Sequence, residues 1–329
     1  MTMTNARQLP LVMQGWALVA LLCAPLSAAA QTSIGTITLE GLSGAEASSD
    51  WPIYAFSQNI STPTSSVGRG AATPELSEIA VELDASTATP QLYAAIAAGT
   101  LLPRASIQLS SLERTGLGQE TFQLIFDDVA LTLTQVARWP AQKRLMSLSF
   151  TFARVAWAYT PRTAAGKPGA AIQGSWDLRT HTGEGKRPDR LRYVVSDDAS
   201  AATPEEIAAD QFSHSLARAS TDVRAGAGSG AGKVVPNVVV LQAAVDSNVA
   251  SHFVALVNGA RLRDASVRVL EAEDSELRYD FREVQLLSMT LTAAAGGTLQ
   301  EQLSFGYERI RWTIGPESKG WDFARNQRW

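Results

Sequence analysis

The segment 226–233 contains the residue types that most resemble a ligand-binding motif. Glycines alternate there with small residues ahead of a lysine, as in loops that bind phosphate: Gly226, Gly228, Gly230, Gly232 and Lys233. A P-loop needs glycine where Ala227 stands and Ser or Thr where Val234 stands. The looser dinucleotide pattern fits, but VVPNVVV follows in place of a helix whose N-terminus would receive phosphate. We therefore predict an assembly loop and no bound cofactor.

Other reactive side chains do not form a catalytic or metal-binding pattern. Asp127 and Asp128 are neighbours in a strand pattern and would face opposite ways, which favours a solvated bulge over an acid/base pair. The histidines are His181, His214 and His252, without the spacing of zinc ligands. No G-x-S-x-G motif is present to anchor a serine nucleophile. The sequence therefore predicts no enzyme and no metal site.

The eight tryptophans could form platforms for stacking sugars. Four of them lie on strands that occur twice in the chain, where core or interface positions are expected: Trp157, Trp312, Trp176 and Trp321. Trp51 and Trp139 lie near proline and turn signals, so we predict that these two are the better candidates for exposed contact.

Composition limits the classes of partner. The chain has 329 residues, of which 45% are hydrophobic and 18% charged, with a net charge of −4. This length supports two cores of ordinary domain size. The sequence has no long Lys/Arg run that would follow a phosphate backbone, so we do not expect a nucleic-acid partner.

The first 30 residues have the order of a secretory signal. Arg7 is followed by an apolar stretch at 16–25 and by small residues up to Ala30, after which we predict cleavage. The apolar stretch is too short to span a bilayer. Cys23 follows Leu22 where lipoprotein signals have a small residue, and its removal would leave a mature chain without cysteine. We therefore expect a periplasmic or extracellular protein.

The chain contains an internal duplication. The run at 146–161 recurs at 302–316, so that Phe150 and Trp157 correspond to Phe305 and Trp312, 155 residues later. The alternation of apolar residues shifts phase in both copies, which predicts a β-bulge near 153–154 and near 308–309.

Each copy also has one short predicted helix before a matching strand. In the first, Thr89 is expected to cap the helix, Pro90 to begin it and Gly99 to end it. In the second, Ser247 is expected to cap a helix at 249–258. The strands at 105–107 and 265–267 then correspond. These repeats predict a first domain at 33–179, an exposed, hinge-like linker at 180–190 and a second domain at 191–329.

The order of these motifs resembles the haemolysin-coregulated protein (Hcp) family, the tube subunit of type VI secretion. The resemblance is carried by ELSEIAVELDASTATPQLYAAIAAGTLLPRASIQL, TFQLIFDDVALTLTQV, MSLSFTFARVAWAYTP and GSWDLRT. It implies a mainly β fold of two tandem two-sheet barrels, each with one flanking helix. It also implies six-lobed rings that stack through long loops. The loop at 226–233 stands in the comparable place in the second copy, whereas the first copy has VGRGAATP, including Gly68 and Arg69.

These observations together predict an exported structural protein that assembles with itself, three chains supplying the six lobes of a ring. Two alternatives stay open at this point. One is a component or secreted cargo of a type VI system whose apparent signal is not cleaved. The other is an extracellular module that binds glycans or peptides.

Overall fold

The computed structural model describes residues 32–42, 50–62, 74–111, 120–137, 145–163, 165–196, 198, 201–203, 205–218, 234–270, 276–294 and 298–329. Residues Thr32–Trp329 form one compact unit. The predicted signal segment lies outside the described residues. Within them, no helix is long and apolar enough to cross a membrane.

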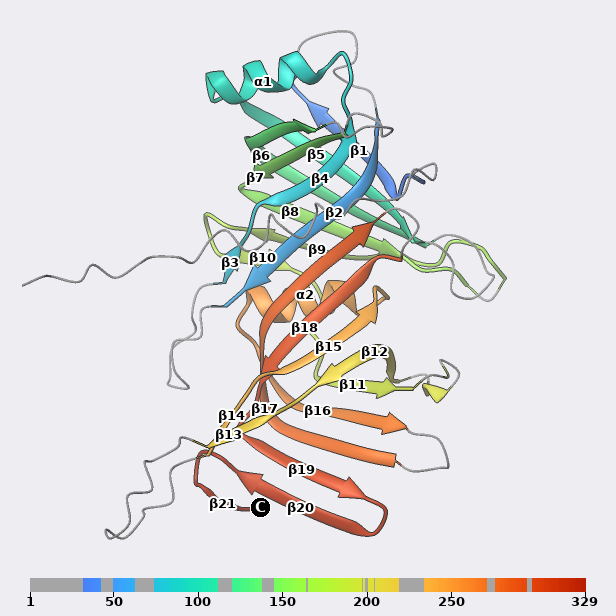
Figure 1. Cartoon of the computed structure of the whole chain (residues 1–329), viewed down its shortest axis with the longest axis vertical. Helices are drawn as coiled ribbons and strands as arrows, with labels where there is room; N and C mark the ends of the chain where they lie inside the picture. Colours follow the sequence, from blue (N-terminus) through green and yellow to red (C-terminus); the bar gives the residue numbers. More distant parts are fainter. Residues whose placement is uncertain are drawn as a thin grey trace, which may run out of the picture. The chain divides into compact units, whose positions relative to one another are not determined.

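The first half of the chain closes into a six-stranded antiparallel barrel (Figure 1). Around the barrel, the strands follow the order β1 (Gly35–Glu40), β5 (Leu101–Ser111), β6 (Glu120–Ala137), β7 (Leu145–Thr151), β4 (Ile79–Asp84) and β2 (Trp51–Ser61). The short β3 (Glu75–Leu76) pairs with β2. This barrel confirms the predicted fold class.

Strand β6 is long enough to belong to two sheets. Its first part pairs with β5 and with β8 (Arg154–Thr160), and its last part pairs with β7. Asp128 has a φ of 56°, and the register with β7 shifts between Leu131 and Leu133. Strands β9 (Ile172–Asp177) and β10 (Thr182–Glu184) extend the sheet beyond β8.

The bulges predicted at 153–154 and 308–309 are wrong in detail. The phase shift there separates two strands, β7 from β8 in the first copy and β18 (Gln300–Gly306) from β19 (Arg309–Ile314) in the second. The alternation changes because the chain leaves one sheet and enters the other. On the partner strands, Asp128 and Glu283 have positive φ values of 56° and 55°. The register shifts follow between Leu131 and Leu133 of β6 and between Leu286 and Ser288 of β17.

The second half closes a barrel of the same size. Its strands follow the order β11 (Arg190–Val195), β16 (Arg261–Leu270), β17 (Glu276–Ala294), β18, β15 (Val239–Ala244) and β12 (Ile207–Ser213). Strands β13 (Leu216–Arg218) and β14 (Val234–Pro236) form a separate hairpin, and β20 (Glu317–Asp322) and β21 (Gln327–Arg328) extend the sheet beyond β19.

The closing strand of the second barrel runs in the opposite direction from that of the first. Strand β1 is antiparallel to both of its neighbours, whereas β11 is parallel to β12 and to β16. A parallel pair needs a longer return than a hairpin, which residues 196–206 supply. Glu206 ends this return and accepts two hydrogen bonds of 2.6 Å from Arg268 on β16. This contact with Arg268 lowers the pKa of Glu206 to about 2.

Each half has one helix, as predicted, but the expected N-terminal caps are wrong. Helix α1 (Thr89–Ala98) begins after Ala88, with Thr89 already inside it, and α2 (Val249–Val257) begins after Asn248. Neither helix has a side-chain cap, and the hydroxyl of Thr89 instead accepts a hydrogen bond from the backbone of Ser86. The predicted C-terminal signal is confirmed, since Gly99 has a φ of 60° and ends α1.

The duplicated core residues occupy equivalent positions. Phe150 and Phe305 are fully buried. Phe150 meets Phe126 edge-on at 5.3 Å between ring centroids, and Phe305 meets Phe281 edge-on at 5.2 Å. The expectation of an exposed Trp51 is wrong, because Trp51 opens β2 opposite Ile37 and is only 8% exposed. Trp139 lies outside the described residues.

The segment 180–190 is exposed over residues 180–187, as expected of a linker. Part of it is nevertheless ordered in the sheet, because β10 pairs with β9. The domain boundaries drawn on either side of it stay a prediction.

Candidate assembly interface

The loop residues predicted to take part in assembly lie outside the described residues. This holds for Gly226, Gly228, Gly230, Gly232 and Lys233, and also for Gly68 and Arg69. Their role in assembly stays a prediction.

The paired carboxylates at the bend of β6 form ion pairs. Asp127 lies 2.9 Å from Arg104 and 3.8 Å from Arg154, and Asp128 lies 2.9 Å from Arg179. All five side chains are partly exposed, so these pairs contribute modestly to stability. The two carboxylates are solvated, as the sequence predicts, but the register shift of β6 lies beyond them, between Leu131 and Leu133.

The three histidines lie in different environments. His181 is exposed, and His214 shares a hydrogen bond of 2.6 Å with the hydroxyl of Tyr307. His252 on α2 is buried, with its Nδ1 3.0 and 3.1 Å from the carboxylate oxygens of Glu301. In the described part of the chain, no three His, Cys, Asp or Glu side chains gather to hold a metal ion.

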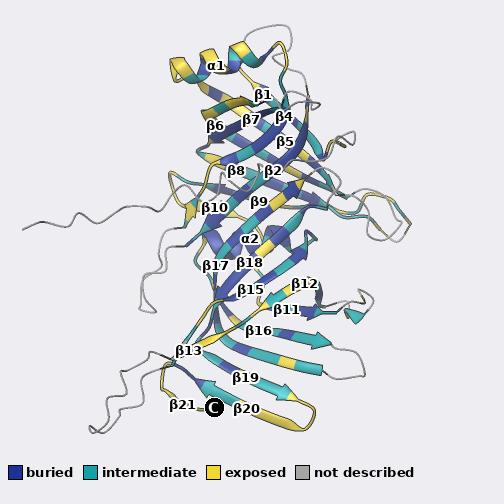
Figure 2. Cartoon of the chain, viewed as in Figure 1, coloured by how far each residue is buried: buried dark blue, intermediate teal, exposed yellow. Residues whose placement is uncertain are grey.

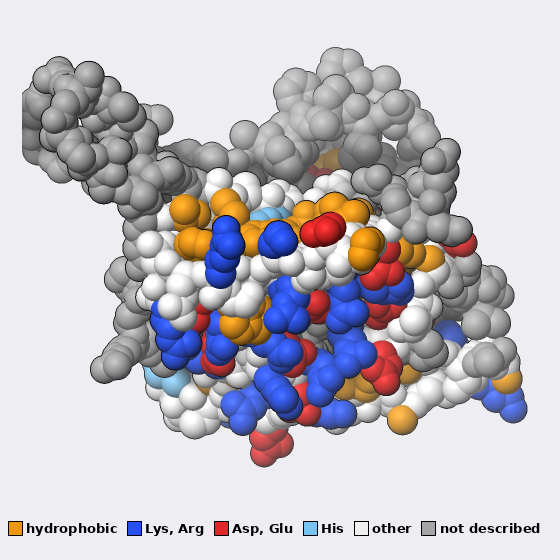
Figure 3. Space-filling view, turned by 90° about the horizontal axis from the view of Figure 1, so that it is seen from below, with side chains coloured by type: hydrophobic (Ala, Val, Ile, Leu, Met, Phe, Trp, Pro, Cys, Tyr) orange, Lys and Arg blue, Asp and Glu red, His pale blue; other side chains and the backbone are white. Residues whose placement is uncertain are grey.

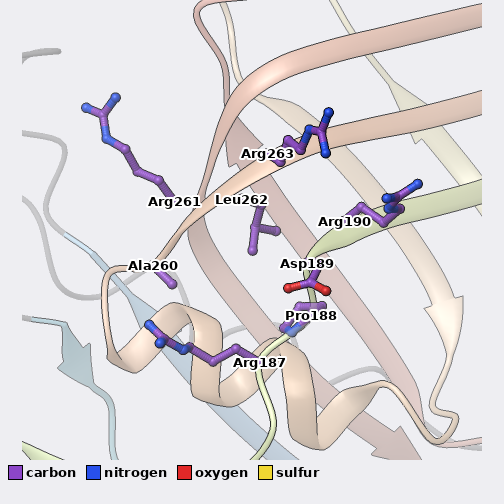
Figure 4. Close-up of a pocket in the computed structure, with 8 residues that line it drawn as sticks. All are labelled: Arg187, Pro188, Asp189, Arg190, Ala260, Arg261, Leu262 and Arg263. Carbon is purple, nitrogen blue, oxygen red and sulfur yellow. The ribbon is translucent and has the colours of Figure 1, made fainter.

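A hollow of about 450 Å³ lies where β11 and β16 begin. Its lining includes Arg187, Arg190, Arg261 and Arg263 together with Asp189. Figure 4 shows that the four guanidinium groups extend in different directions and that the carboxylate of Asp189 lies between them. The arginines therefore do not converge on one anion.

Charges on the second half are mixed in sign. Figure 3 shows Lys and Arg side chains interspersed with Asp and Glu on the face seen from below, with a band of hydrophobic side chains along one edge. Arginines on β16, β17 and β19 form ion pairs: Arg261 with Glu308, Arg282 with Asp264 and Arg309 with Glu283. Such a surface does not present the single-sign field that nucleic acid requires.

The two halves join through a strand pairing. Residues 55–61 of β2 pair antiparallel with residues 288–294 of β17, from Ser61 opposite Ser288 to Ala55 opposite Ala294. The hydroxyl of Thr290 donates a hydrogen bond of 3.0 Å to the side chain of Asn59 across this pairing. One half therefore adds a strand edge to the sheet of the other half, in the manner of β-augmentation.

Helix α2 makes the second contact of this junction. It packs against β8 and β9 of the first half. The ring of Phe253 on α2 lies 3.9 Å from the ring of Trp157 on β8, and both are almost fully buried. Tyr159 on β8 is buried beside them, where burial, its hydrogen bond to Glu120 and the charge of Asp246 on the second half raise its pKa.

Sequence reasoning missed this junction, although one signal pointed to it. Helix α2 has the sequence VASHFVALV, which is apolar on nearly every side, and a helix of this kind is buried on more than one face. Figure 2 shows the difference directly: α2 is buried, whereas α1 carries exposed residues along its length.

Comparisons with known proteins agree with this architecture. The profile of the family described as type VI secretion system effector, Hcp, matches residues 35–159 and 197–314. The second match leaves out β11, the strand whose direction is reversed. A search among curated proteins finds no match.

Three similar solved structures each cover less than half of the chain. A type six secretion system protein shares 17% identity over 46% of this chain and 100% of its own, with a TM-score of 0.39. Hcp1 from Salmonella typhimurium shares 13% identity over 45% of this chain and 97% of its own, with a TM-score of 0.35. A type VI secretion system effector from Yersinia pestis shares 15% identity over 44% and 98%, with a TM-score of 0.33. The family match covers most of the chain in two stretches, and the protein therefore belongs to the Hcp family of type VI secretion.

Proposed function

We propose that this protein is an exported, non-enzymatic structural protein whose single chain supplies two Hcp-like lobes and assembles with other copies into rings or a filament. The observation that carries the proposal is the junction between β2 and β17. Two lobes of the same fold are already joined side by side there, through a strand edge and a buried helix.

The geometry of the junction supports repetition. It joins two different surfaces of the lobe, because the first half contributes β2 and β8 while the second contributes β17 and α2. Contacts of this head-to-tail kind generate closed rings when the rotation closes and filaments when it does not. With two lobes in each chain, three chains would complete the six-lobed ring implied by the family.

Self-assembly is tested with the mature chain that begins at Gln31. Light scattering over a range of concentrations should show particles larger than one chain, and electron microscopy should show rings or filaments. A protein that stays monomeric at high concentration and binds a glycan or peptide saturably would reject the proposal in favour of a binding module.

Export rests on the order of charge, apolar stretch and small residues before Gln31. N-terminal sequencing of the protein recovered from cells should give Gln31 or a close neighbour as the first residue, outside the cytoplasm. A full-length cytoplasmic chain as the sole stable form would contradict export and favour a secretion component that keeps its N-terminus.

The glycine-rich loop is proposed to contribute to stacking between rings. It offers no large apolar side chain to a core, and ordering its glycines costs backbone entropy, so it gains most when a neighbour orders it. Shortening 226–233 to two residues should leave thermal unfolding nearly unchanged while shortening the stacked particles. Equal particle length in the shortened variant would reject this role for the loop.

A further inference from the structure

Each surface used in the junction has an equivalent on the other half that is not used within the chain. The positions of the register shifts show which residues of the two halves are equivalent. The shift between Leu131 and Leu133 of β6 corresponds to the shift between Leu286 and Ser288 of β17. The shift between Ile53 and Ala55 of β2 likewise corresponds to the shift between Ala209 and Gln211 of β12. The last part of β6 is thus equivalent to the part of β17 that pairs with β2. Residues 211–217 are equivalent to the part of β2 that pairs with β17.

The first half exposes the equivalent of the surface that the second half buries. We call it the α1 face, formed by α1 and residues 133–137 of β6. Tyr93 holds the helix position of Phe253 and is 45% exposed, and Val136 holds the strand position of the buried Leu291 and is 38% exposed. Only Leu92 and Ala95 of α1 are buried. Among the described strands, none pairs with the outer edge of residues 133–137.

A hollow of about 780 Å³ lies in the α1 face. It is lined by Ala85, Ser86, Thr87, Thr89, Pro90, Tyr93 and Val136. In the second half, the equivalents of Thr89, Pro90 and Tyr93 are Val249, Ala250 and Phe253. These three residues of the second half are buried. The corresponding place in the second half lies against β8 and β9, which approach α2 from the first half.

The second half exposes the complementary surface, which we call the β19 face. It consists of β19, β20 and the strand edge at 211–217. Trp312 is equivalent to Trp157, and Ile314 is equivalent to Tyr159. Trp157, which packs on Phe253 across the junction, and Tyr159 are buried, whereas Trp312 is partly exposed and Ile314 is 58% exposed. Leu216 on the strand edge is also exposed, whereas its equivalent on β2, Ile60, is buried.

We infer that the α1 face of one chain docks on the β19 face of a second copy, in the geometry that already joins the two halves within a chain. This inference rests on the proposed function and deepens it by naming the interface. Tyr93 would take the place of Phe253 and stack on Trp312, and Ile314 would enter the hollow. The two faces contain five of the seven large hydrophobic residues that are exposed in the described chain: Tyr93, Leu133, Val136, Leu216 and Ile314.

The strand register of this docking follows from the internal junction. Asn59 of β2 lies opposite Thr290 of β17. The backbone carbonyl of Asn59 accepts a hydrogen bond from the backbone N–H of Ser77, on the other edge of β2. Asn59 and Thr290 therefore exchange no backbone hydrogen bonds. The equivalent residues are Ser215, whose carbonyl accepts from Asn237 in the same way, and Gln135. Opposed residues of this kind lie about 4.5 Å apart at their Cα atoms, within the range that a disulfide spans.

Cysteine cross-linking tests the docking directly. The mature chain has no cysteine, so Gln135→Cys and Ser215→Cys in one chain create the only thiols. Because docking is head-to-tail, oxidation should give a ladder of covalent multimers on non-reducing gels. Gln135→Cys alone should give no such ladder. As a matched control, Asn59→Cys with Thr290→Cys should give a disulfide within one chain.

A ladder from the double variant would support the inference. Particles that assemble in solution without any ladder, while the control disulfide forms, would overturn the inference and leave the proposed self-assembly standing. A chain that neither assembles nor cross-links would overturn both.

Exposed side chains provide a second test that does not disturb the core. Tyr93→Asp and Ile314→Asp should each raise the concentration needed for half-assembly by about tenfold or more, since each places a charge in an apolar contact. Leu101→Asp is the control, because Leu101 is 61% exposed and its equivalent in the second half, Arg261, stays exposed beside the junction. An equal effect of all three variants would count against the docking.

Discussion

The two halves share one barrel but place different chemistry beneath the helix. In the second half, His252 on α2 and Glu301 on β18 form a buried pair, with the half-buried Asp246 nearby. In the first half, Leu92 and Met146 hold the equivalent positions. A buried ion pair is weak support for stability, since apolar residues of similar volume often serve as well. The comparison shows that the barrel accepts both solutions.

The halves also differ in how the chain enters the barrel. Strand β1 comes first and turns back antiparallel into β2, whereas β11 follows β10 after residues 185–189 and runs the other way. In both barrels a strand fills the equivalent position, β1 between β2 and β5 and β11 between β12 and β16. The fold therefore requires a strand at this place more strictly than it requires a direction.

The largest effects are expected from the equivalent core residues. Phe150→Ala and Phe305→Ala should each destabilise its own half by about 3–5 kcal/mol, because both rings are fully buried against a second phenylalanine. Denaturant unfolding of the two variants measures this directly. A neutral result in either half would show that the two cores are not equivalent.

The buried pair offers the sharpest contrast between the halves. His252→Leu alone should cost about 3–5 kcal/mol, because it leaves Glu301 buried without its partner. His252→Leu combined with Glu301→Met installs the residues of the first half and should restore most of that loss. Chemical denaturation of the single and double variants checks this. A double variant as unstable as the single one would mean that the second half depends on the pair itself.

The two tryptophans test the junction in the isolated chain. Trp157→Ala should cost about 3 kcal/mol or more, because Trp157 is buried against Phe253. Trp312→Ala should cost about 1 kcal/mol in a dilute monomer, because Trp312 is partly exposed. Thermal unfolding at low concentration separates them. Equal losses would indicate that Trp312 is covered within its own chain.

A smaller, pH-dependent difference is expected from the same pair. Burial acts to lower the pKa of His252, but Glu301 and Asp246 outweigh it and raise that pKa; burial also raises the pKa of Asp246. A raised folded-state pKa means stability that is present at low pH and lost as pH rises through that pKa. The stability of the second half should therefore fall as pH rises above the ordinary ranges of these groups, about 3.9 for Asp and 6.5 for His.

Melting temperatures measured between pH 5 and pH 8.5 test this dependence. In the variant with both His252→Leu and Glu301→Met, the part of the pH dependence that is due to His252 should be absent. An unchanged slope in that variant would assign the dependence to other groups.

Much of the fold could be predicted from the sequence because the duplication repeats its apolar alternation. Phe150 and Phe305, which correspond in the duplication, both lie in the core, and Gly99 ends its helix because only glycine adopts the left-handed conformation without strain. The direction of β11 could not be predicted in this way, because an alternating pattern of period two reads the same in both directions.

The junction could not be predicted from local patterns either. Pairing between β2 and β17 joins residues more than 200 positions apart, and the edge residues Ser57, Asn59 and Ser61 are polar. The burial of Trp51 could not be predicted for a similar reason. The neighbouring proline indicates a local turn, but it does not show that β1 pairs with the strand at Trp51. The predicted assembly residues Gly68 and Arg69 and the loop at 226–233 lie outside the described residues.

We propose that each chain contributes two lobes to an assembly that repeats its internal junction. Counting lobes by electron microscopy and chains by the mass of the same particles tests it most directly. We expect half as many chains as lobes, three chains in a six-lobed ring, with every lobe in contact with two neighbours. Particles with as many chains as lobes, or a chain that stays single at all concentrations, would contradict it.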